Sequence, residues 1–208
     1  EPKAVYEYLE WLKSVVSLPV HIVSAGNIRE DLIRGLNSDG NKPSAVPFFT
    51  ISPFGKKGMG SRQCTAGYKI RPVRQKIVEL IGGRKKSGCE LLIGISTDEY
   101  LRVKPSRVQY IVNKYPLVDL NMSRKDCVRW INSHGYPQPP KSSCIGCPFH
   151  ADKQWRSLTA EEFADAVYVD NSIRHRPKGD LQQFMHRSCK PLSEVDFSTP
   201  EENGQLNM

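Results

Sequence analysis

The chain has 208 residues, of which 38% are hydrophobic, and its formal net charge is +8 at neutral pH. This length supports one good hydrophobic core with a small appendage rather than two full domains. No apolar run approaches the roughly 20 residues that span a bilayer and no signal peptide opens the chain, so we expect a cytoplasmic protein without membrane association. The basic side chains either form a solvated surface or attract the phosphates of a nucleotide or a nucleic acid.

The first part of the chain predicts alternating helix and strand. Residues 2–16 place apolar side chains on one face at helical spacing, and residues 20–23 form a short apolar run typical of a strand. A second helical pattern runs through Leu36. Residues 37–60 are rich in Gly, Pro, Ser and Asn without periodicity, so we expect a long loop that serves as a substrate lid.

The middle of the chain predicts a parallel sheet. A helix is expected over residues 69–81, and the continuous apolar run CELLIGI at 89–95 is typical of a strand buried on both faces. The resulting fold class is α/β, with a doubly wound, mostly parallel sheet that binds ligands at the carboxyl ends of its strands. We assign residues 1–120 to this nucleotide-binding-like domain.

Residues 121–208 predict a mainly helical segment that holds a cysteine loop. Ser123 is a typical cap of a helix that ends at Gly135, and Thr159 begins another helix with a capping box. Between the two helices, residues 136–150 read YPQPPKSSCIGCPFH, where the prolines oppose regular structure.

The cysteines carry the strongest chemical signal. Cys144 and Cys147 have the spacing that lets two thiolates bind one metal or cluster. Cys64 lies about eighty residues earlier, in the pattern R-x-C-T-x3-K-x2-P. In a chain of this length, such a pair indicates metal or redox chemistry rather than disulfides. A zinc site completed by His150 or Cys189 is the alternative to an iron–sulfur cluster.

The two cysteine motifs together resemble the adenylyl-sulfate and phosphoadenylyl-sulfate (PAPS) reductase family, within the PP-loop group of adenine-nucleotide α-hydrolase-like proteins. Cluster-bearing members carry Arg-x-Cys-Cys-x3-Lys-x2-Pro and then a distant Cys-x2-Cys. The likeness covers roughly residues 60–150, including IGISTDE at 93–99 and YPLVD at 115–119. The resemblance implies a 4Fe-4S cluster on the three cysteines, and ATP or an adenylylated sulfate as the bound nucleotide.

Four cations are candidate ligands for phosphate or sulfate in such a protein. Lys69 and Arg71 follow Cys64 on a predicted helix, where they would stabilise negative charge beside a cluster. Arg102 and Arg107 are the cations nearest to the place where the family has an Arg-containing substrate loop. The alternative for such residues is a solvated surface.

Three departures from the family pattern shape the expected function. Thr65 replaces the second cysteine, which leaves one iron of the cluster without a protein ligand. Similar PP-loop enzymes of tRNA thiolation use such an open iron to hold a sulfur atom. The family's Ser-Gly-Gly-x-Asp-Ser phosphate loop does not occur in these residues, so we expect that Glu1 is not the natural start and that this loop lies upstream. The reductases' C-terminal Glu-Cys-Gly-Leu-His nucleophile is also absent, and Cys189 stands in a different setting.

The sequence therefore predicts an enzyme of sulfur chemistry that binds an adenine nucleotide and an iron–sulfur cluster. Sulfur transfer to a nucleic acid, a sulfurtransferase activity, is slightly favoured over sulfonucleotide reduction, an oxidoreductase activity. The alternative is a non-catalytic module, stabilised by zinc or a cluster, that binds nucleic acid or another subunit. A homodimer is compatible with both.

Overall fold

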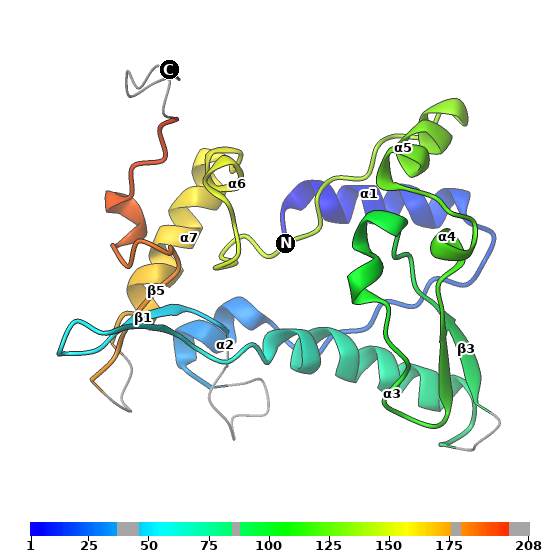
Figure 1. Ribbon diagram of the computed structural model, residues 1–208, viewed down its shortest axis with the longest axis horizontal. Helices are drawn as coiled ribbons and strands as arrows, with labels where there is room; N and C mark the ends of the chain where they lie inside the picture. The colour runs from blue at the N-terminus through cyan, green and yellow to red at the C-terminus, as the bar shows by residue number, and fades with distance from the viewer. Residues whose placement is uncertain (37–45, 85–87, 176–179, 200–208) are drawn as a thin grey trace. The chain divides into compact units, whose positions relative to one another are not determined.

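The computed structural model describes the chain apart from four segments, and Figure 1 shows it in ribbon form; the described residues are 1–36, 46–84, 88–175 and 180–199. They divide into two compact units. Unit 1 consists of Glu1–Pro72 and Lys141–Met208, and unit 2 is Val73–Pro140. Unit 2 is therefore an insertion in the sequence of unit 1, and the predicted boundary near residue 120 falls within it.

Two helices open unit 1. Helix α1 spans Lys3–Val15, close to the predicted range, and buries Val5. Helix α2 spans Ile28–Arg34 and has clear signals at both ends. The Asn27 side chain accepts a hydrogen bond from the Arg29 backbone N–H at 3.0 Å, and Gly35 ends the helix at a φ of 78°.

Three short antiparallel strands form the sheet of unit 1, in the order β2-β1-β5. Strand β1 is Phe49–Ile51, β2 is Lys57–Met59 and β5 is Gln182–Phe184. A tight turn joins β1 to β2, and Gly55 supplies the positive φ of 76° in that turn. Strand β1 also pairs with β5, so residues more than 130 positions apart lie side by side.

Helix α7, Ala160–Ile173, carries the core of unit 1. Thr159 and Glu162 form the predicted capping box at its start. The helix packs against α2, and Arg29 of α2 donates from Nε to Asp165 Oδ1 at 2.7 Å. The buried cluster around it consists of Leu32, Phe48, Trp155, Ala166, Val169, Ile173, Met185 and Leu192.

A fully buried carboxylate connects α7 to the C-terminal part of unit 1. Asp170 has no exposed surface, and it pairs with Arg174 on the same helix. Its two oxygens also accept hydrogen bonds from the backbone N–H groups of Met185, at 2.8 Å, and Leu192, at 3.0 Å. Leu192 opens the short 3-10 helix Leu192–Glu194. One side chain thus fixes the helix, the end of β5 and the segment after it.

Unit 2 contains the end of helix α3 (Arg71–Leu80) and a pair of parallel strands, β3 (Cys89–Leu92) and β4 (Ile111–Lys114). The 3-10 helix Thr97–Arg102 lies between these strands in the sequence. A Cβ atom at Gly88 would lie 1.6 Å from the Tyr110 carbonyl oxygen, so only glycine allows the strands to begin this close together.

Two further helices complete unit 2, α4 (Pro116–Asp119) and α5 (Arg124–Ser133). Ser123 caps α5 as predicted, and its hydroxyl, together with Arg129, holds the pKa of Asp126 well below its usual range. Among the described residues, no helix combines the length and the apolar composition that a membrane span requires.

The predicted doubly wound parallel sheet is wrong. The described part of the chain contains only the three-stranded antiparallel sheet and the two-stranded parallel one. In β3, Cys89 and Leu91 are half-buried while Glu90 and Leu92 are exposed, so this strand is not buried on both faces. It ends at Leu92, before the apolar run is complete, and it pairs with β4 in a sheet of two strands.

Local predictions had mixed outcomes. Helix α3 lies within the predicted range of 69–81, whereas residues 20–23 form no strand. Val20 and Ile22 are exposed, so the apolar composition of this run does not reflect burial. The lid predicted at 37–60 contains β1 and β2 in its second half, and residues 37–45 lie outside the described part of the chain.

Replacing Asp170 by alanine should lower the free energy of unfolding by about 3–5 kcal/mol, because Arg174 would stay largely buried without its carboxylate partner and two backbone N–H groups would lose their acceptor. Urea unfolding followed by circular dichroism measures this loss. Ser172→Ala on the exposed side of the same helix is the control and should change stability by less than about 0.5 kcal/mol. Equal effects of the two substitutions would contradict the role given to Asp170.

Candidate functional site

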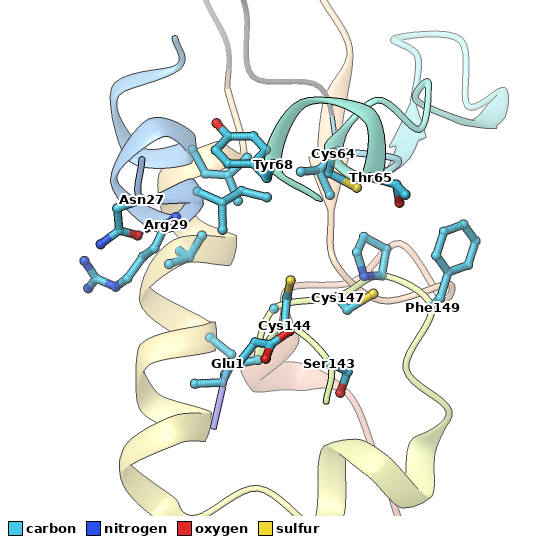
Figure 2. Close-up of a pocket in the computed structure, with 18 of the residues that line it drawn as sticks. Glu1, Asn27, Arg29, Cys64, Thr65, Tyr68, Ser143, Cys144, Cys147 and Phe149 are labelled. Carbon is cyan, nitrogen blue, oxygen red and sulfur yellow. Dashed lines mark hydrogen bonds between the residues drawn. The ribbon is translucent and has the colours of Figure 1, made fainter. Parts of the chain in front are cut away.

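A cavity of about 770 Å³ lies within unit 1, and the three predicted metal-binding cysteines line it. Its volume is in the range of small-molecule sites. Figure 2 shows Cys64 on one wall and Cys144 and Cys147 on the facing wall. The N-terminal residue, the turn before α2 and the middle of α7 supply the rest of the lining, which includes Glu1, Ser24, Gly26, Asn27, Asp165, Ala166 and Val169.

The first wall is a wide π-helical turn, Thr65–Ile70, that Cys64 precedes. Such turns occur often at functional sites because their wider winding redirects side chains. Tyr68 on this turn donates a hydrogen bond from its hydroxyl to Asp31 of α2, whose side chain is fully buried and also pairs with Arg34. A buried carboxylate therefore fixes the turn that presents Cys64.

The second wall is the turn that contains Cys144 and Cys147. The Cys147 N–H donates to the Cys144 carbonyl at 3.2 Å, and the His150 N–H donates to the Cys147 carbonyl at 3.0 Å. Met185, at the end of β5, lies directly against this turn. A Cβ atom at Gly146 would be 2.8 Å from Met185 Cε and 3.1 Å from its sulfur, so any larger residue there would force the end of the Met185 side chain to shift.

Positive charge lies beside the cysteines. Lys69 lines the cavity and is 3.6 Å from a carboxylate oxygen of Glu1, and Arg62 also lines it, stacked 5.0 Å above the centre of the Phe149 ring. Burial raises the pKa of the Cys144 thiol, and the Lys69 charge partly opposes that rise. These cations favour anions, whether thiolates or the phosphate or sulfate of a ligand.

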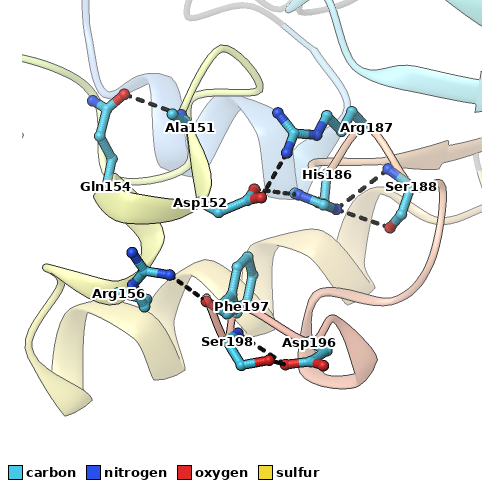
Figure 3. A network of polar contacts seen from close by, with 10 residues as sticks. All are labelled: Ala151, Asp152, Gln154, Arg156, His186, Arg187, Ser188, Asp196, Phe197 and Ser198. Atoms are coloured by element: carbon cyan, nitrogen blue, oxygen red, sulfur yellow. Dashed lines mark hydrogen bonds and ion pairs between the residues drawn. The ribbon is translucent and has the colours of Figure 1, made fainter. Parts of the chain in front are cut away.

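A polar network holds the segment that follows the second wall (Figure 3). Asp152 begins helix α6 (Asp152–Arg156), and its carboxylate receives hydrogen bonds from His186 Nε2 at 3.0 Å and from Arg187 at 2.5 Å. The hydroxyl and the backbone N–H of Ser188 both point at His186 Nδ1, which makes that nitrogen the acceptor and leaves the proton on Nε2. The network thus ties α6 to the turn after β5.

The cysteine geometry bears on the choice between a single metal ion and a cluster. Among the residues that the structure describes, no three His, Cys, Asp or Glu side chains converge closely enough to hold one metal ion. Thiolates around one zinc lie within about 4 Å of each other, because each is about 2.3 Å from the metal. The thiols of Cys64, Cys144 and Cys147 therefore line one cavity without forming a single-ion site in the described part of the chain.

The two residues considered as a further ligand are not among those lining the cavity. His150 packs edge-on against Trp155, with ring centres 4.8 Å apart, and its buried Nδ1 has no hydrogen-bond partner among the described residues. Burial, reinforced by Lys141, lowers the pKa of His150 and keeps its ring neutral. Cys189 is buried in a left-handed conformation with a φ of 58°, its thiol donates to the Arg187 carbonyl at 3.8 Å, and burial raises its pKa.

Only one of the four cations predicted to bind phosphate or sulfate lines the cavity. Lys69 does, while Arg71 is exposed at the start of α3 outside the lining. Arg102, which pairs with Glu99, and Arg107 belong to unit 2. The roles given to Arg71, Arg102 and Arg107 remain predictions.

Sequence reasoning assigned no role to several residues that line the cavity. Arg62 stands two positions before Cys64 in the motif, and this spacing was the available signal for it. Tyr68, Phe149 and Met185 gave none, because a tyrosine, a phenylalanine or a methionine in these positions is usually a packing residue. No protein-family model matches the chain, and no curated protein or solved structure matches it either.

The contact between Gly146 and Met185 can be tested by a double-mutant cycle. Gly146→Ala should lower the free energy of unfolding by about 1–3 kcal/mol, because the new methyl group displaces the Met185 side chain. In a Met185→Ala background the same change should cost much less, since the displaced atoms are gone. Urea unfolding of the four proteins gives the coupling energy. Additive effects would show that the two residues do not touch.

Proposed function

We propose that unit 1 binds an iron–sulfur cluster through Cys64, Cys144 and Cys147 and uses it in sulfur chemistry on a substrate activated by an adenine nucleotide. The observation that carries the proposal is the presence of all three cysteines on one cavity, although they come from segments about eighty residues apart. A cluster held by three thiolates supplies an iron with an unprotected coordination position, which favours sulfur transfer to a nucleic acid over sulfonucleotide reduction.

The neighbouring residues have roles that follow from their chemistry. Thr65 lines the cavity beside Cys64, and a hydroxyl is a poor ligand for iron where thiolates are present. Lys69 and Arg62 would bind the phosphate or sulfate of the ligand. Met185 packs behind the Cys144–Cys147 turn and holds it in place rather than reacting.

The test of the cluster is anaerobic purification of the whole protein followed by analysis of iron, acid-labile sulfide and zinc. Iron and sulfide should be present in the parent protein and lost in Cys64→Ser, Cys144→Ser and Cys147→Ser. Cys127→Ser in unit 2 is the matched control and should keep the full content.

Cys189→Ser separates two versions of the site. Retention of the cluster supports three protein ligands and an open iron, whereas its loss would show a closed, four-cysteine centre and end the sulfur-transfer mechanism. Stoichiometric zinc without sulfide would remove the cluster and favour a non-catalytic binding module instead.

Lys69 should contribute to nucleotide binding. Lys69→Ala should weaken the binding of ATP or adenylyl sulfate by about threefold to tenfold, since a partly exposed charge-assisted hydrogen bond is lost. Isothermal titration calorimetry measures the affinity. Lys3→Ala, an exposed lysine of the same unit outside the cavity lining, is the control and should bind like the parent. Equal affinities for both variants would remove Lys69 from the site.

A further inference from the structure

Unit 2 carries a group of exposed, stacked aromatic rings at the end of α5. The ring centres of Trp130 and His134 are 4.1 Å apart with 28° between the planes, and those of His134 and Tyr136 are 5.9 Å apart with 27° between them. The Trp130 and Tyr136 rings are 6.0 Å apart. Trp130 exposes 50% of its surface and Tyr136 exposes 40%. We call these three residues the aromatic platform.

The end of helix α5 builds this platform. Gly135 adopts a φ of 67°, its N–H donates to the Asn132 carbonyl, and the Tyr136 N–H donates to the Ile131 carbonyl, both at 3.1 Å. This pair of bonds is the Schellman motif, in which glycine turns the chain back over the last helical turn. The turn brings the Tyr136 ring to within 6.0 Å of the Trp130 ring. The rings are therefore held in place before any ligand binds.

The helix adds a further constraint on the His134 ring. Its Nδ1 lies 2.8 Å from the Trp130 carbonyl oxygen and 3.2 Å from the Ser133 hydroxyl. The imidazole is thereby kept close to parallel with the indole. A stack that is fixed by a helix end loses little conformational entropy when it binds another flat ring.

The charge of unit 2 indicates what kind of molecule binds there. Val73–Pro140 contains twelve Lys and Arg residues against six Asp and Glu, so this third of the chain carries +6 of the formal net charge of +8. Three of the cations, Arg124, Lys125 and Arg129, are exposed on α5 itself. A patch of aromatic rings on an apolar surface would suit a protein partner, but rings on a helix that also carries three exposed cations, one of them (Arg129) paired with Asp126, suit a polyanion with flat groups.

We propose that the aromatic platform and the cations of α5 bind single-stranded nucleic acid. Unpaired bases would stack on the exposed rings, and the phosphates would lie near the α5 cations, as is general for proteins that bind single strands. None of these observations involves the cysteine cavity. That the nucleic acid is the acceptor of sulfur is a further step, and this step rests on the proposed function.

The test uses the whole protein and fluorescein-labelled oligomers of about 12 nucleotides, oligo(dT) and oligo(U), with a duplex of the same length. Fluorescence anisotropy gives the affinities at about 50 and 200 mM salt. Trp130→Ala should weaken binding of the single strands by about tenfold or more, because one stacking surface is removed. Trp130→Phe should recover most of the affinity, and circular dichroism checks that both variants are folded.

Tyr100→Ala is the matched control, because Tyr100 is an exposed aromatic residue of unit 2 outside the platform, and it should bind like the parent. Tighter binding of oligo(U) or of oligo(dT) identifies RNA or DNA as the preferred single strand. Absence of binding, equal affinity for duplex and single strands, or an unchanged affinity of Trp130→Ala would each overturn the proposal. Serine variants of the three cavity cysteines should bind the oligomers normally. A failure of the cluster proposal can therefore be told apart from a failure of the nucleic-acid proposal.

Discussion

The structure of unit 1 depends on two carboxylates that are completely removed from water. Asp170 of α7 and Asp31 of α2 lie on helices that pack against each other, and each is paired with an arginine on its own helix. A buried carboxylate needs several donors to offset its lost hydration. Both find donors outside their helices, Asp170 in the backbone of Met185 and Leu192 and Asp31 in the Tyr68 hydroxyl. Packing of two helices therefore fixes parts of the chain that are distant in sequence.

These two carboxylates act on opposite walls of the cysteine cavity. Asp31 holds the π-turn behind Cys64, while Asp170 holds Met185, which in turn lies against the glycine between Cys144 and Cys147. A site whose walls are positioned by neighbouring groups is preorganised, so binding a cofactor does not have to supply the energy of bringing the walls together.

The sequence predicted the local features of this protein better than the distant ones. Capping residues such as Ser123 and Thr159, and the stop at Gly135, act within one helical turn, and the structure has all three in their expected roles. Pairing of β1 with β5 left no sign in either segment, because each is only three residues long and its partner is more than 130 positions away. The apolar run at 89–95 led to the wrong prediction of a strand buried on both faces. Its composition indicated burial, but burial depends on neighbouring elements that only the fold supplies.

The cysteine pattern found the three cavity thiols, whereas the cations predicted from it were placed less well. Residues that are a few positions apart in one motif stay close in space, which is why Lys69 and Cys64 line the same cavity. Arg102 and Arg107 were chosen by nearness in sequence to a remote motif, and they fall in the other unit. The aromatic platform was also missed, since Trp130 and Tyr136 each look like ordinary packing residues until the turn at Gly135 brings them together.

The insertion of unit 2 between the two parts of unit 1 sets an order of events during synthesis. Unit 2 is continuous, so all of its contacts are available once its last residue has left the ribosome. The Cys64 wall, by contrast, is synthesised before unit 2, and the opposite wall follows it. The 68 residues of Val73–Pro140 are added between them, which takes about 3–14 s at the usual rates of translation. The opposite wall then needs Met185, which comes later still. Cys64 is thus made well before the groups that enclose it, and the lining of the cavity is complete only after Met185 has been added.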